Sequence, residues 1–364
     1  MESFKGGAKK RIIGLDVLRI FLAVLIYLFH SHMHFKCDYF LFNPFISMGA
    51  IAMTGFFMLS GYILHQTYIN SNLTQIQEIK NFYLKRFITV LPLYYFVAII
   101  YSLYGTAEDI VTMKENVLLF PVELLCLQTT FSSLFAFTHN GGTWFISCIM
   151  MCYILFPFIL NISQQLSNRS KIILAFFICV ILLYAPIVQY AFGVSMIYEN
   201  PFYRSIEFTV GVLLSSLICY TPNDSKIIKK LQNKGTAFFV LIVLVSGVTF
   251  ARVLGIPDVT YMLYNWIALP CFAALIVSLT SESCSVDVKK NKIIVYLSNI
   301  SFAFYCCQIL PVWVLSGKTC GIMGNDSNFF RIAISFAYCL VGSIIIHELI
   351  EKPCSKYLRL KFVK

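Results

Sequence analysis

Apolar runs of about 20 residues recur along the whole chain, and each has the length that an α-helix needs to cross a bilayer. Of the 364 residues, 59% are hydrophobic and 12% are charged, whereas soluble domains average roughly 25% charged residues. Backbone groups in lipid must be hydrogen-bonded within their own segment, so such runs fold as helices. The sequence therefore predicts an all-α fold, a polytopic transmembrane helical bundle with about ten spanning helices. The eleven apolar segments cover residues 13–33, 45–68, 87–104, 117–136, 143–162, 172–192, 204–220, 236–253, 261–280, 294–316 and 329–349.

The loops between these segments predict the orientation, because short cytoplasmic loops are enriched in Lys and Arg. Six stretches hold 21 of the 28 basic residues and should share the cytoplasmic side. Segment 117–136 must then begin and end on the opposite side, and it contains Pro121, Glu123 and Gln128, so we expect a re-entrant or interfacial segment. The six stretches are the residues before 13 and the ranges 69–86, 163–171, 221–235, 281–293 and 350–364.

This pattern predicts a multi-pass protein of the inner (plasma) membrane with both termini in the cytoplasm. The first segment is expected to be a permanent anchor, and residues 1–364 are expected to form a single domain without a separate soluble part. The net charge of +11 does not indicate nucleic-acid binding, because the basic residues are spread over the loops. The thirteen cysteines lie mostly in apolar segments without metal-ligand spacing, so we expect packing roles and no metal.

The first segment carries Arg19 and His30 with ten apolar or aromatic residues between them. Eleven helical steps place the two side chains within ~20° of one azimuth and ~16 Å apart along the axis. An arginine near the middle of a span costs roughly 2.5–3.5 kcal/mol and usually faces a cavity or a partner. Asp16, one turn earlier, is a candidate partner for Arg19. The pattern favours a polar path with His30 as general base, since imidazole suits proton transfer near neutrality.

Two other interpretations of this stripe stay open. The Asp16–Arg19 pair could reach the inner interface without a functional role, with His30 at the outer interface. Alternatively, His30 and His34, four residues apart, could bind a metal, although no third ligand is evident.

Seven motifs in fixed order resemble the acyltransferase 3 family of integral membrane enzymes. Each motif alone is weak in so apolar a chain, but their order covers nearly its full length. They are LDVLRIFLAVLIYLFH (residues 15–30), GFFMLSGYIL (55–64), LKRFITVLPLYY (84–95), TWFISCIMMCYILFPFI (143–159), FYRSIEFTVGVLL (202–214), ISFAFY (300–305) and EKP (351–353).

The resemblance implies transfer of an acetyl group from cytoplasmic acetyl-CoA to a hydroxyl of a surface polysaccharide, lipopolysaccharide or lipid-linked oligosaccharide. It implies that His30 is the catalytic base and that Arg19 is its partner along the stripe. Arg86, together with Lys85, would bind the CoA phosphates where the third segment meets the inner interface. Arg19 could hold a pyrophosphate or stabilise charge on the thioester oxygen.

The chain departs from the family pattern at two positions. The third-segment motif usually has a second arginine three residues after the first, and Thr89 stands there. The late motif usually continues to a histidine, and Gln308 stands there. These changes concern donor contacts or the acceptor, and neither alters Arg19 or His30.

Other polar residues have both a functional and a structural interpretation. Ser60, Trp144 and Glu207 are candidates for substrate binding, and Glu351 is a candidate support for the basic residues of the third segment. Equally, Ser60 could serve close helix packing, Trp144 could be an interfacial belt residue, and Glu207 could pair within its helix with Arg204. For Glu351 the alternative is a solvated position at the membrane surface.

Two alternative functions remain. A succinyl group could replace acetyl, although Thr89 in place of an arginine disfavours an acidic acyl group. A glycan or lipid exporter would also need many spans and a buried polar path, but two matched halves are not evident in the sequence.

Overall fold

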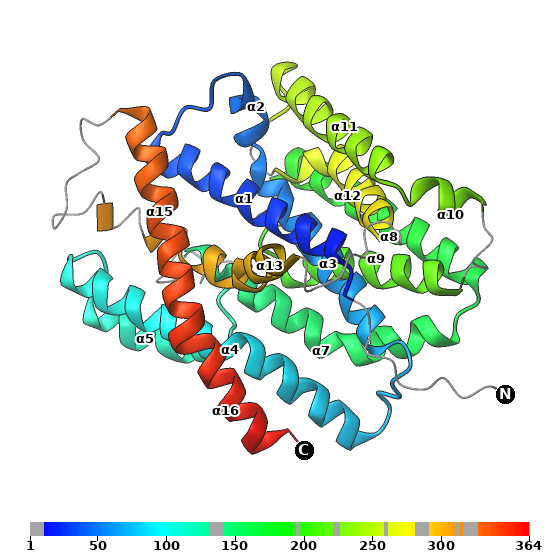
Figure 1. Ribbon diagram of the computed structural model, residues 1–364, viewed down its shortest axis with the longest axis horizontal. Helices are drawn as coiled ribbons and strands as arrows, with labels where there is room; N and C mark the ends of the chain where they lie inside the picture. The colour runs from blue at the N-terminus through cyan, green and yellow to red at the C-terminus, as the bar shows by residue number, and fades with distance from the viewer. Residues whose placement is uncertain are drawn as a thin grey trace.

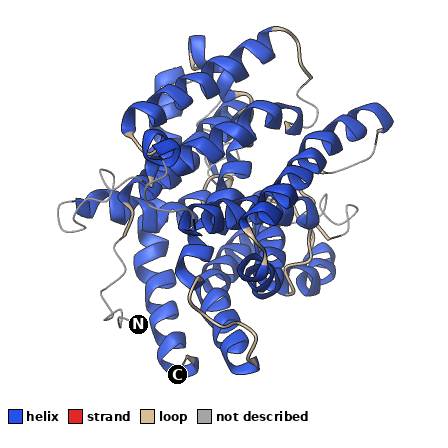
Figure 2. Ribbon diagram, turned by 90° about the vertical axis from the view of Figure 1, so that its right-hand side faces the viewer, coloured by secondary structure: helices blue, strands red, loops and turns tan. Residues whose placement is uncertain are grey.

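The computed structural model describes residues 11–130, 141–193, 197–220, 226–257, 261–280, 291–310, 314–315 and 327–363, and every regular element in them is helical (Figure 2). Eight helices of this part are long and apolar enough to cross a membrane, or nine if the bent pair Phe40–Ile46 and Gly49–Tyr68 forms one span. A further apolar helix, Lys292–Cys306, is shorter. The predicted all-α, polytopic bundle is therefore confirmed.

The helices follow the predicted segments in order (Figure 1). They are α1 (Ile13–Phe35), α2 (Asn43–Ile46), α3 (Ala52–Tyr68), α4 (Ile76–Ala107), α5 (Met113–Leu124), α7 (Trp144–Gln165), α8 (Asn168–Phe192), α9 (Pro201–Tyr220), α10 (Lys226–Leu231), α11 (Lys234–Val253), α12 (Asn265–Leu279), α13 (Lys292–Cys306), α15 (Asn328–Ile346), the π-helical turn η7 (His347–Glu351) and α16 (Lys352–Phe362).

The crossing of α3 and α9 is the closest-packed contact relevant to the site. A Cβ atom added to Gly61 would lie 2.0 Å from the carbonyl oxygen of Phe208, and one added to Gly211 would lie 1.9 Å from that of Met58. Only glycine lets the two backbones approach to this distance, as in many membrane helix pairs. This contact fixes α9 against the face of α3.

The segment predicted not to span the membrane contains α5, which is 12 residues long. Twelve residues reach only ~18 Å, short of the roughly 30 Å of a bilayer core. The hydroxyls of Tyr94 and Tyr95 donate to the carbonyls of Glu123 and Leu124 at 3.0 and 2.7 Å, which holds the end of α5 against α4. Residues 131–136 of the predicted segment lie outside the described residues.

Contacts between helix ends show which loops share one end of the bundle. The Gln164 amide donates to the carbonyl of Ile69 at 2.9 Å, and Gln66 donates to Cys219 Sγ at 2.9 Å. Gln232 likewise donates to Thr280 at 3.2 Å. The helix ends that flank four of the loops predicted to be cytoplasmic are thus paired with one another, and we call this the basic end.

Two helices extend beyond their predicted limits. α4 begins at Ile76 rather than near residue 87, and the helix from Asn328 continues through η7 to Phe362 instead of ending near residue 349. Pro353 does not stop it, because it lies in the first turn of α16, where a proline disturbs little. Ser355 donates to the carbonyl of Ile88 at 3.0 Å, so α16 lies beside α4 (Figure 1). The C-terminal basic residues are thereby carried alongside the third predicted segment.

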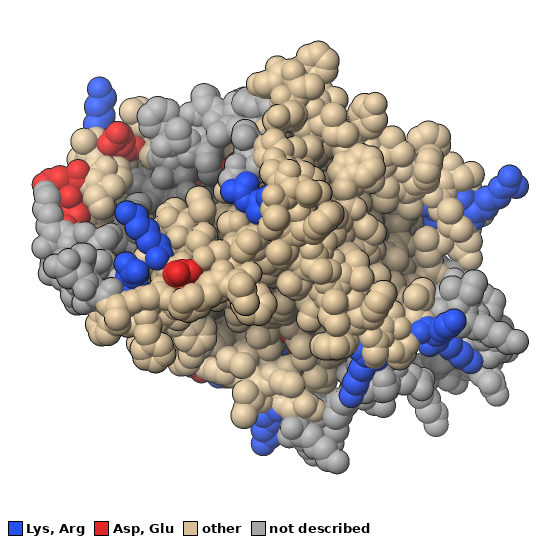
Figure 3. Space-filling model, turned by 90° about the horizontal axis from the view of Figure 1, so that it is seen from above, with Lys and Arg blue, Asp and Glu red and all other residues tan. Residues whose placement is uncertain are grey.

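The outer surface suits contact with lipid. The face seen in Figure 3 presents a broad stretch of described surface without charged side chains. α8 is an extreme case, with Phe176, Phe177 and Ile181 all exposed. Polar chemistry is therefore confined to the interior and the helix ends.

Candidate active site

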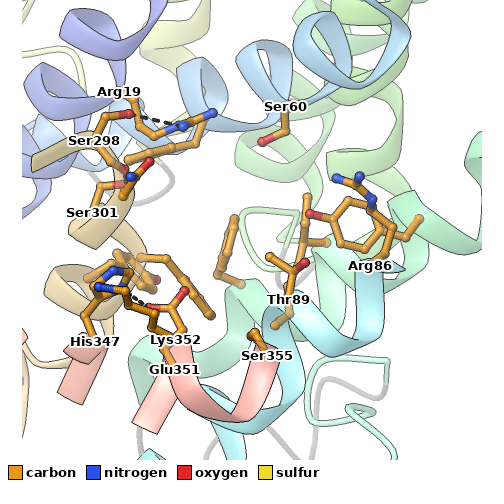
Figure 4. Close-up of a pocket in the computed structure, with 18 of the residues that line it drawn as sticks. Arg19, Ser60, Arg86, Thr89, Ser298, Ser301, His347, Glu351, Lys352 and Ser355 are labelled. Carbon is orange, nitrogen blue, oxygen red and sulfur yellow. Dashed lines mark hydrogen bonds and ion pairs between the residues drawn. The ribbon is translucent and has the colours of Figure 1, made fainter. Parts of the chain in front are cut away.

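A cavity of about 790 Å³ lies between α1, α3, α4, α7, α13 and the C-terminal helix (Figure 4). This volume falls within the usual range for small-molecule sites. Figure 4 shows Arg19 and Ser298 on one side of the cavity, and Arg86 and Thr89 on another. Four of the predicted site residues line it: Arg19, Ser60, Arg86 and Glu351.

Arg19 has a charge that is only loosely paired. Its Nη1 donates to Ser298 Oγ at 3.2 Å and lies 3.9 Å from the Asp16 carboxylate. Asp16 is instead held by Arg11, which donates to both carboxylate oxygens at 2.7 and 2.8 Å, and by Ser298 at 2.7 Å. The predicted Asp16–Arg19 pair is present but weak, because Arg11 neutralises the aspartate. The Arg19 side chain is 29% exposed and lines the cavity.

Arg86 is positioned by aromatic rings. Its guanidinium carbon lies 5.4 Å from the ring centre of Tyr68 and 5.9 Å from that of Phe82, and Nη2 donates to the Tyr68 hydroxyl at 3.2 Å. Its Nε is buried and has no hydrogen-bond partner in the described part of the chain. Lys85 is exposed and is not part of the lining. The structure thus brings Arg86, but not Lys85, to the cavity.

Glu351 is paired differently from what we expected. Its Oε2 lies 2.7 Å from His347 Nδ1, within the π-helical turn, rather than against Arg86 or Lys85. Both side chains line the cavity. Residues four apart share one face of a helix, and this pair lies in a π-helical turn, a feature that often occurs at functional sites.

Ser60 and Gly61 face different surroundings although they are adjacent. Ser60 lines the cavity (Figure 4), whereas Gly61 lies at the close contact with Phe208 of α9. The helix-packing role that was open for Ser60 is therefore filled by its neighbour.

His30 lies outside the cavity lining and is held by the residue at which the chain departs from the family pattern. His30 Nδ1 is 2.9 Å from Oε1 of Gln308, and Nε2 of Gln308 donates to the carbonyl of Ala23 at 3.3 Å. A carbonyl only accepts, so it fixes the amide with Oε1 toward the imidazole. Nδ1 must then carry a proton, and the neutral ring has its lone pair on Nε2. Gln308 thus selects one tautomer of His30.

The predicted stripe of α1 runs along α13. Arg19 contacts Ser298 in the middle of α13, and His30 contacts Gln308 just after the end of that helix. The cavity extends along α13 as far as Tyr305, whose hydroxyl donates to the carbonyl of Gly142 at 2.6 Å. Gln308 follows one helical turn later. His30 therefore lies just beyond the end of the cavity at Tyr305, away from the basic residues of α4 and α16.

Glu207 belongs to a separate buried cluster with Arg204, Thr54 and Asn265. Arg204 Nη1 and Glu207 Oε2 are 2.7 Å apart and both side chains are fully buried. Glu207 Oε1 also accepts hydrogen bonds from Thr54 at 2.8 Å and Asn265 at 3.1 Å. None of the four lines the cavity. The geometry is that of an intrahelical ion pair, and substrate binding by Glu207 stays a prediction.

Trp144 packs against this cluster. Its ring is 5.4 Å from the guanidinium carbon of Arg204 and 4.9 Å from the ring of Tyr198, and it is almost completely buried. The neighbouring residue Phe145 lines the cavity. Trp144 therefore lies between the buried cluster and the cavity wall. Its contact with substrate stays a prediction.

The metal interpretation of His30 and His34 gains no third ligand. Their ring centres are 5.8 Å apart. Over the described residues, no group of three or more His, Cys, Asp or Glu side chains is placed to bind a metal ion.

Two basic residues of α16 were missed as site residues. Lys356 and Arg359 line the cavity, and Arg359 Nη2 donates to Thr89 Oγ1 at 3.0 Å. The sequence contained a signal, since Lys352, Lys356 and Arg359 are spaced i, i+4 and i+7 and so share one helix face.

Comparison with known protein families agrees with the motifs. The sequence profile of the acyltransferase domain of the acyltransferase 3 family matches residues 12–348, nearly the whole chain. Comparisons with curated proteins and with solved structures find no match. The predicted family is therefore confirmed: this chain belongs to the acyltransferase 3 family and is a membrane-embedded acyltransferase.

Proposed function

We propose that this protein transfers an acetyl group from acetyl-CoA to a hydroxyl of a cell-envelope glycan or lipid-linked sugar. The observation that carries the proposal is that one face of α1 holds both Arg19 and His30. Arg19 lines the basic cavity, and His30 contacts Gln308 just beyond the end of the cavity at Tyr305. One end of the stripe suits an anionic donor and the other suits proton transfer.

The donor would enter through the basic end, which we assign to the cytoplasm on the basis of its Lys and Arg content. Arg86 would contact donor phosphates, since its buried Nε has no partner in the described residues and guanidinium binds phosphate well. Arg19 lies deeper and would face the pyrophosphate or the thioester oxygen. The separation of ~16 Å between Arg19 and His30 leaves room for an extended pantetheine arm between them.

His30 would act as the general base. Because Gln308 keeps the proton on Nδ1, Nε2 can accept the proton of the acceptor hydroxyl as its oxygen attacks the thioester carbon. The carbon–sulfur bond then breaks, the ester forms, and the imidazolium returns the proton to the leaving CoA thiolate. Direct transfer needs no covalent enzyme intermediate.

The acceptor would approach from the opposite side of the bundle, where α1 ends and α7 begins. Trp144 and Phe145 lie at the start of α7, near the contact of Tyr305 with Gly142. We assign the acceptor to the envelope glycans because the family resemblance favours them, and we keep Ser60, Trp144 and Glu207 as candidates for positioning substrate.

The test is acyl transfer by the purified protein in liposomes, with radiolabelled acetyl-CoA and isolated envelope glycan. Label should appear in the glycan, and succinyl-CoA in a parallel reaction tests the alternative donor. His30→Ala should reduce transfer by roughly 10²–10⁴-fold, the usual contribution of a general base.

The matched control is His32→Ala, because two helical steps turn its side chain about 200° away from that of His30 and its ring contacts the carbonyl of Cys37. It should retain wild-type transfer. Full activity in the His30→Ala variant, or passage of glycan across the membrane without acyl transfer, would contradict the proposal.

A further inference from the structure

Arg359 fills the space beside Thr89, the position at which the third-segment arginine is missing. Thr89 Oγ1 donates its proton to the carbonyl of Lys85 at 2.7 Å, so its lone pairs are free to accept from Arg359 Nη2 at 3.0 Å. The guanidinium of a helix some 270 residues away is thus fixed one turn from Arg86.

The charges around this point do not balance. Lys352 is paired with Glu348 at 2.8 Å, and Glu351 is paired with His347. Within the ranges that the structure describes, no carboxylate lies within 4 Å of Arg86, Lys356 or Arg359, although all three line the same cavity. A concentration of one charge in a cleft attracts a ligand of the opposite sign.

The location of Lys356 and Arg359 in the cavity indicates which part of a CoA thioester they would contact. Lys356 and Arg359 are exposed, so they stand at the mouth of the cavity, whereas Arg19 and Tyr305 lie further along its lining. In a CoA thioester the nucleotide, with its 3′-phosphate, is the end opposite the thioester. A phosphate monoester carries close to two negative charges near neutral pH and offers three acceptor oxygens.

We propose that Lys356 and Arg359 of α16 form, together with Arg86, a binding site for the 3′-phosphate of the CoA donor. This proposal rests on the proposed function and adds to it a site on a helix that lies beyond the matched residues 12–348. In this chain, the neighbouring helix α16 supplies the guanidinium that α4 lacks at Thr89.

The experiment compares binding of CoA and of 3′-dephospho-CoA to the purified protein, without acceptor, by a ligand-binding titration. The wild type should prefer CoA. Arg359→Ala should weaken CoA binding by about 10- to 100-fold, the range for one charge-assisted contact, and should lose most of the preference. Lys361→Ala is the matched control, because this cation lies over the rings of Tyr357 and Phe362 and is not part of the cavity lining.

A rescue variant separates loss of the site from loss of folding. Thr89→Arg in the Arg359→Ala background should restore much of the preference for CoA, because it returns a guanidinium to the same point from α4. An Arg359→Ala protein that still prefers CoA as the wild type does would overturn the phosphate site, while acyl transfer dependent on His30 would leave the proposed function standing. A wild-type protein that binds neither compound and transfers no acetyl group would overturn both.

Discussion

Arg19 and Arg204 are both arginines inside the membrane bundle, and each has a carboxylate three residues away in its own helix. At Arg204 that pairing is complete, since Glu207 lies at 2.7 Å and neither side chain is exposed. At Arg19 the pairing is left open, because Asp16 lies at 3.9 Å and is bound by Arg11. Identical spacing in the sequence therefore gives one neutral pair and one available charge.

The difference shows how this fold separates stability from ligand binding. A buried charge is tolerated when its partner and its hydrogen bonds are all present, and Arg204 has further contacts with the carbonyl of Tyr198 at 2.7 Å and the ring of Tyr198 at 4.6 Å. Arg19 is partly exposed to the cavity and so does not require a full set of protein partners. The buried cluster joins α3, α9 and α12 through paired contacts, and we propose that the open charge of Arg19 serves a ligand.

Glu207→Ala should have the largest effect on the protein. Removing one partner leaves the Arg204 charge buried and unpaired, which typically costs about 3–5 kcal/mol. The variant should lose most of its thermal stability in detergent. Glu348→Ala, which breaks the exposed pair with Lys352, should change thermal stability little, because solvent screens this pair. Equal stability of the two variants would show that Glu207 is not a structural partner.

Arg19→Ala should reverse this pattern and affect activity more than stability. We expect acyl transfer to fall by roughly 10²–10³-fold, as when one stabilising donor is removed from an active site. Thermal unfolding should shift little, because Asp16 keeps Arg11 and Ser298 as partners. If Arg19→Ala instead lost as much thermal stability as Glu207→Ala while its folded fraction kept full activity, Arg19 would be a structural residue like Arg204.

Much of this comparison could be predicted from the sequence. Helical periodicity placed Arg19 and His30 on one stripe, and loop charges indicated which helix ends lie together. Both are local properties of the chain, set by 3.6 residues per turn and by the cost of moving charge through lipid.

The remaining features depend on contacts between distant segments. Nothing in the periodicity of α1 shows that Arg11 binds Asp16, that Gln308 holds His30, or that Arg359 stands beside Thr89. The last two pairs are separated by about 280 and 270 positions and require the packing of α13 and α16. The continuation of the last helix to Phe362 could not be predicted from hydropathy either, because the apolar pattern ends near residue 349 and the helix beyond it is polar.

The other end of the stripe can be probed through Gln308. Gln308→Leu should reduce acyl transfer by about ten-fold, because His30 can then adopt the other tautomer or turn away. Gln308→Glu keeps an acceptor opposite Nδ1 and should restore much of the rate, whereas the loss of the amide donor to the carbonyl of Ala23 should lower thermal stability. If both variants lose activity and stability together, Gln308 supports the fold rather than the imidazole.

The smallest expected effect is at Glu199, and it tests whether Arg204 stabilises a second carboxylate besides Glu207. Burial raises the pKa of the Glu199 carboxyl above its usual 4.5, and the nearby Arg204 opposes this only in part. A raised pKa means that this group favours folding below pH 4.5 and loses that contribution as the pH rises through the folded-state value.

Glu199→Gln should therefore match the wild type in thermal stability under acidic conditions and exceed it slightly at neutral pH. Thermal unfolding of both proteins across this pH range measures the difference. A variant that is less stable than the wild type at neutral pH would mean that Arg204 is shared between two carboxylates.

The π-helical turn at His347–Glu351 determines which face of α16 points toward the cavity. A π turn holds one residue more than an α-helical turn, and each residue of an α-helix advances the side chains by 100°, so winding these same residues as regular α-helix would rotate all of α16 by about that angle. Ser355, Lys356 and Arg359 would then leave the cavity together, although every one of them remained in the sequence. Deleting one residue within the turn would instead convert it to an α turn and keep α16 in phase, so the winding of this turn decides which side chains of α16 meet the cavity.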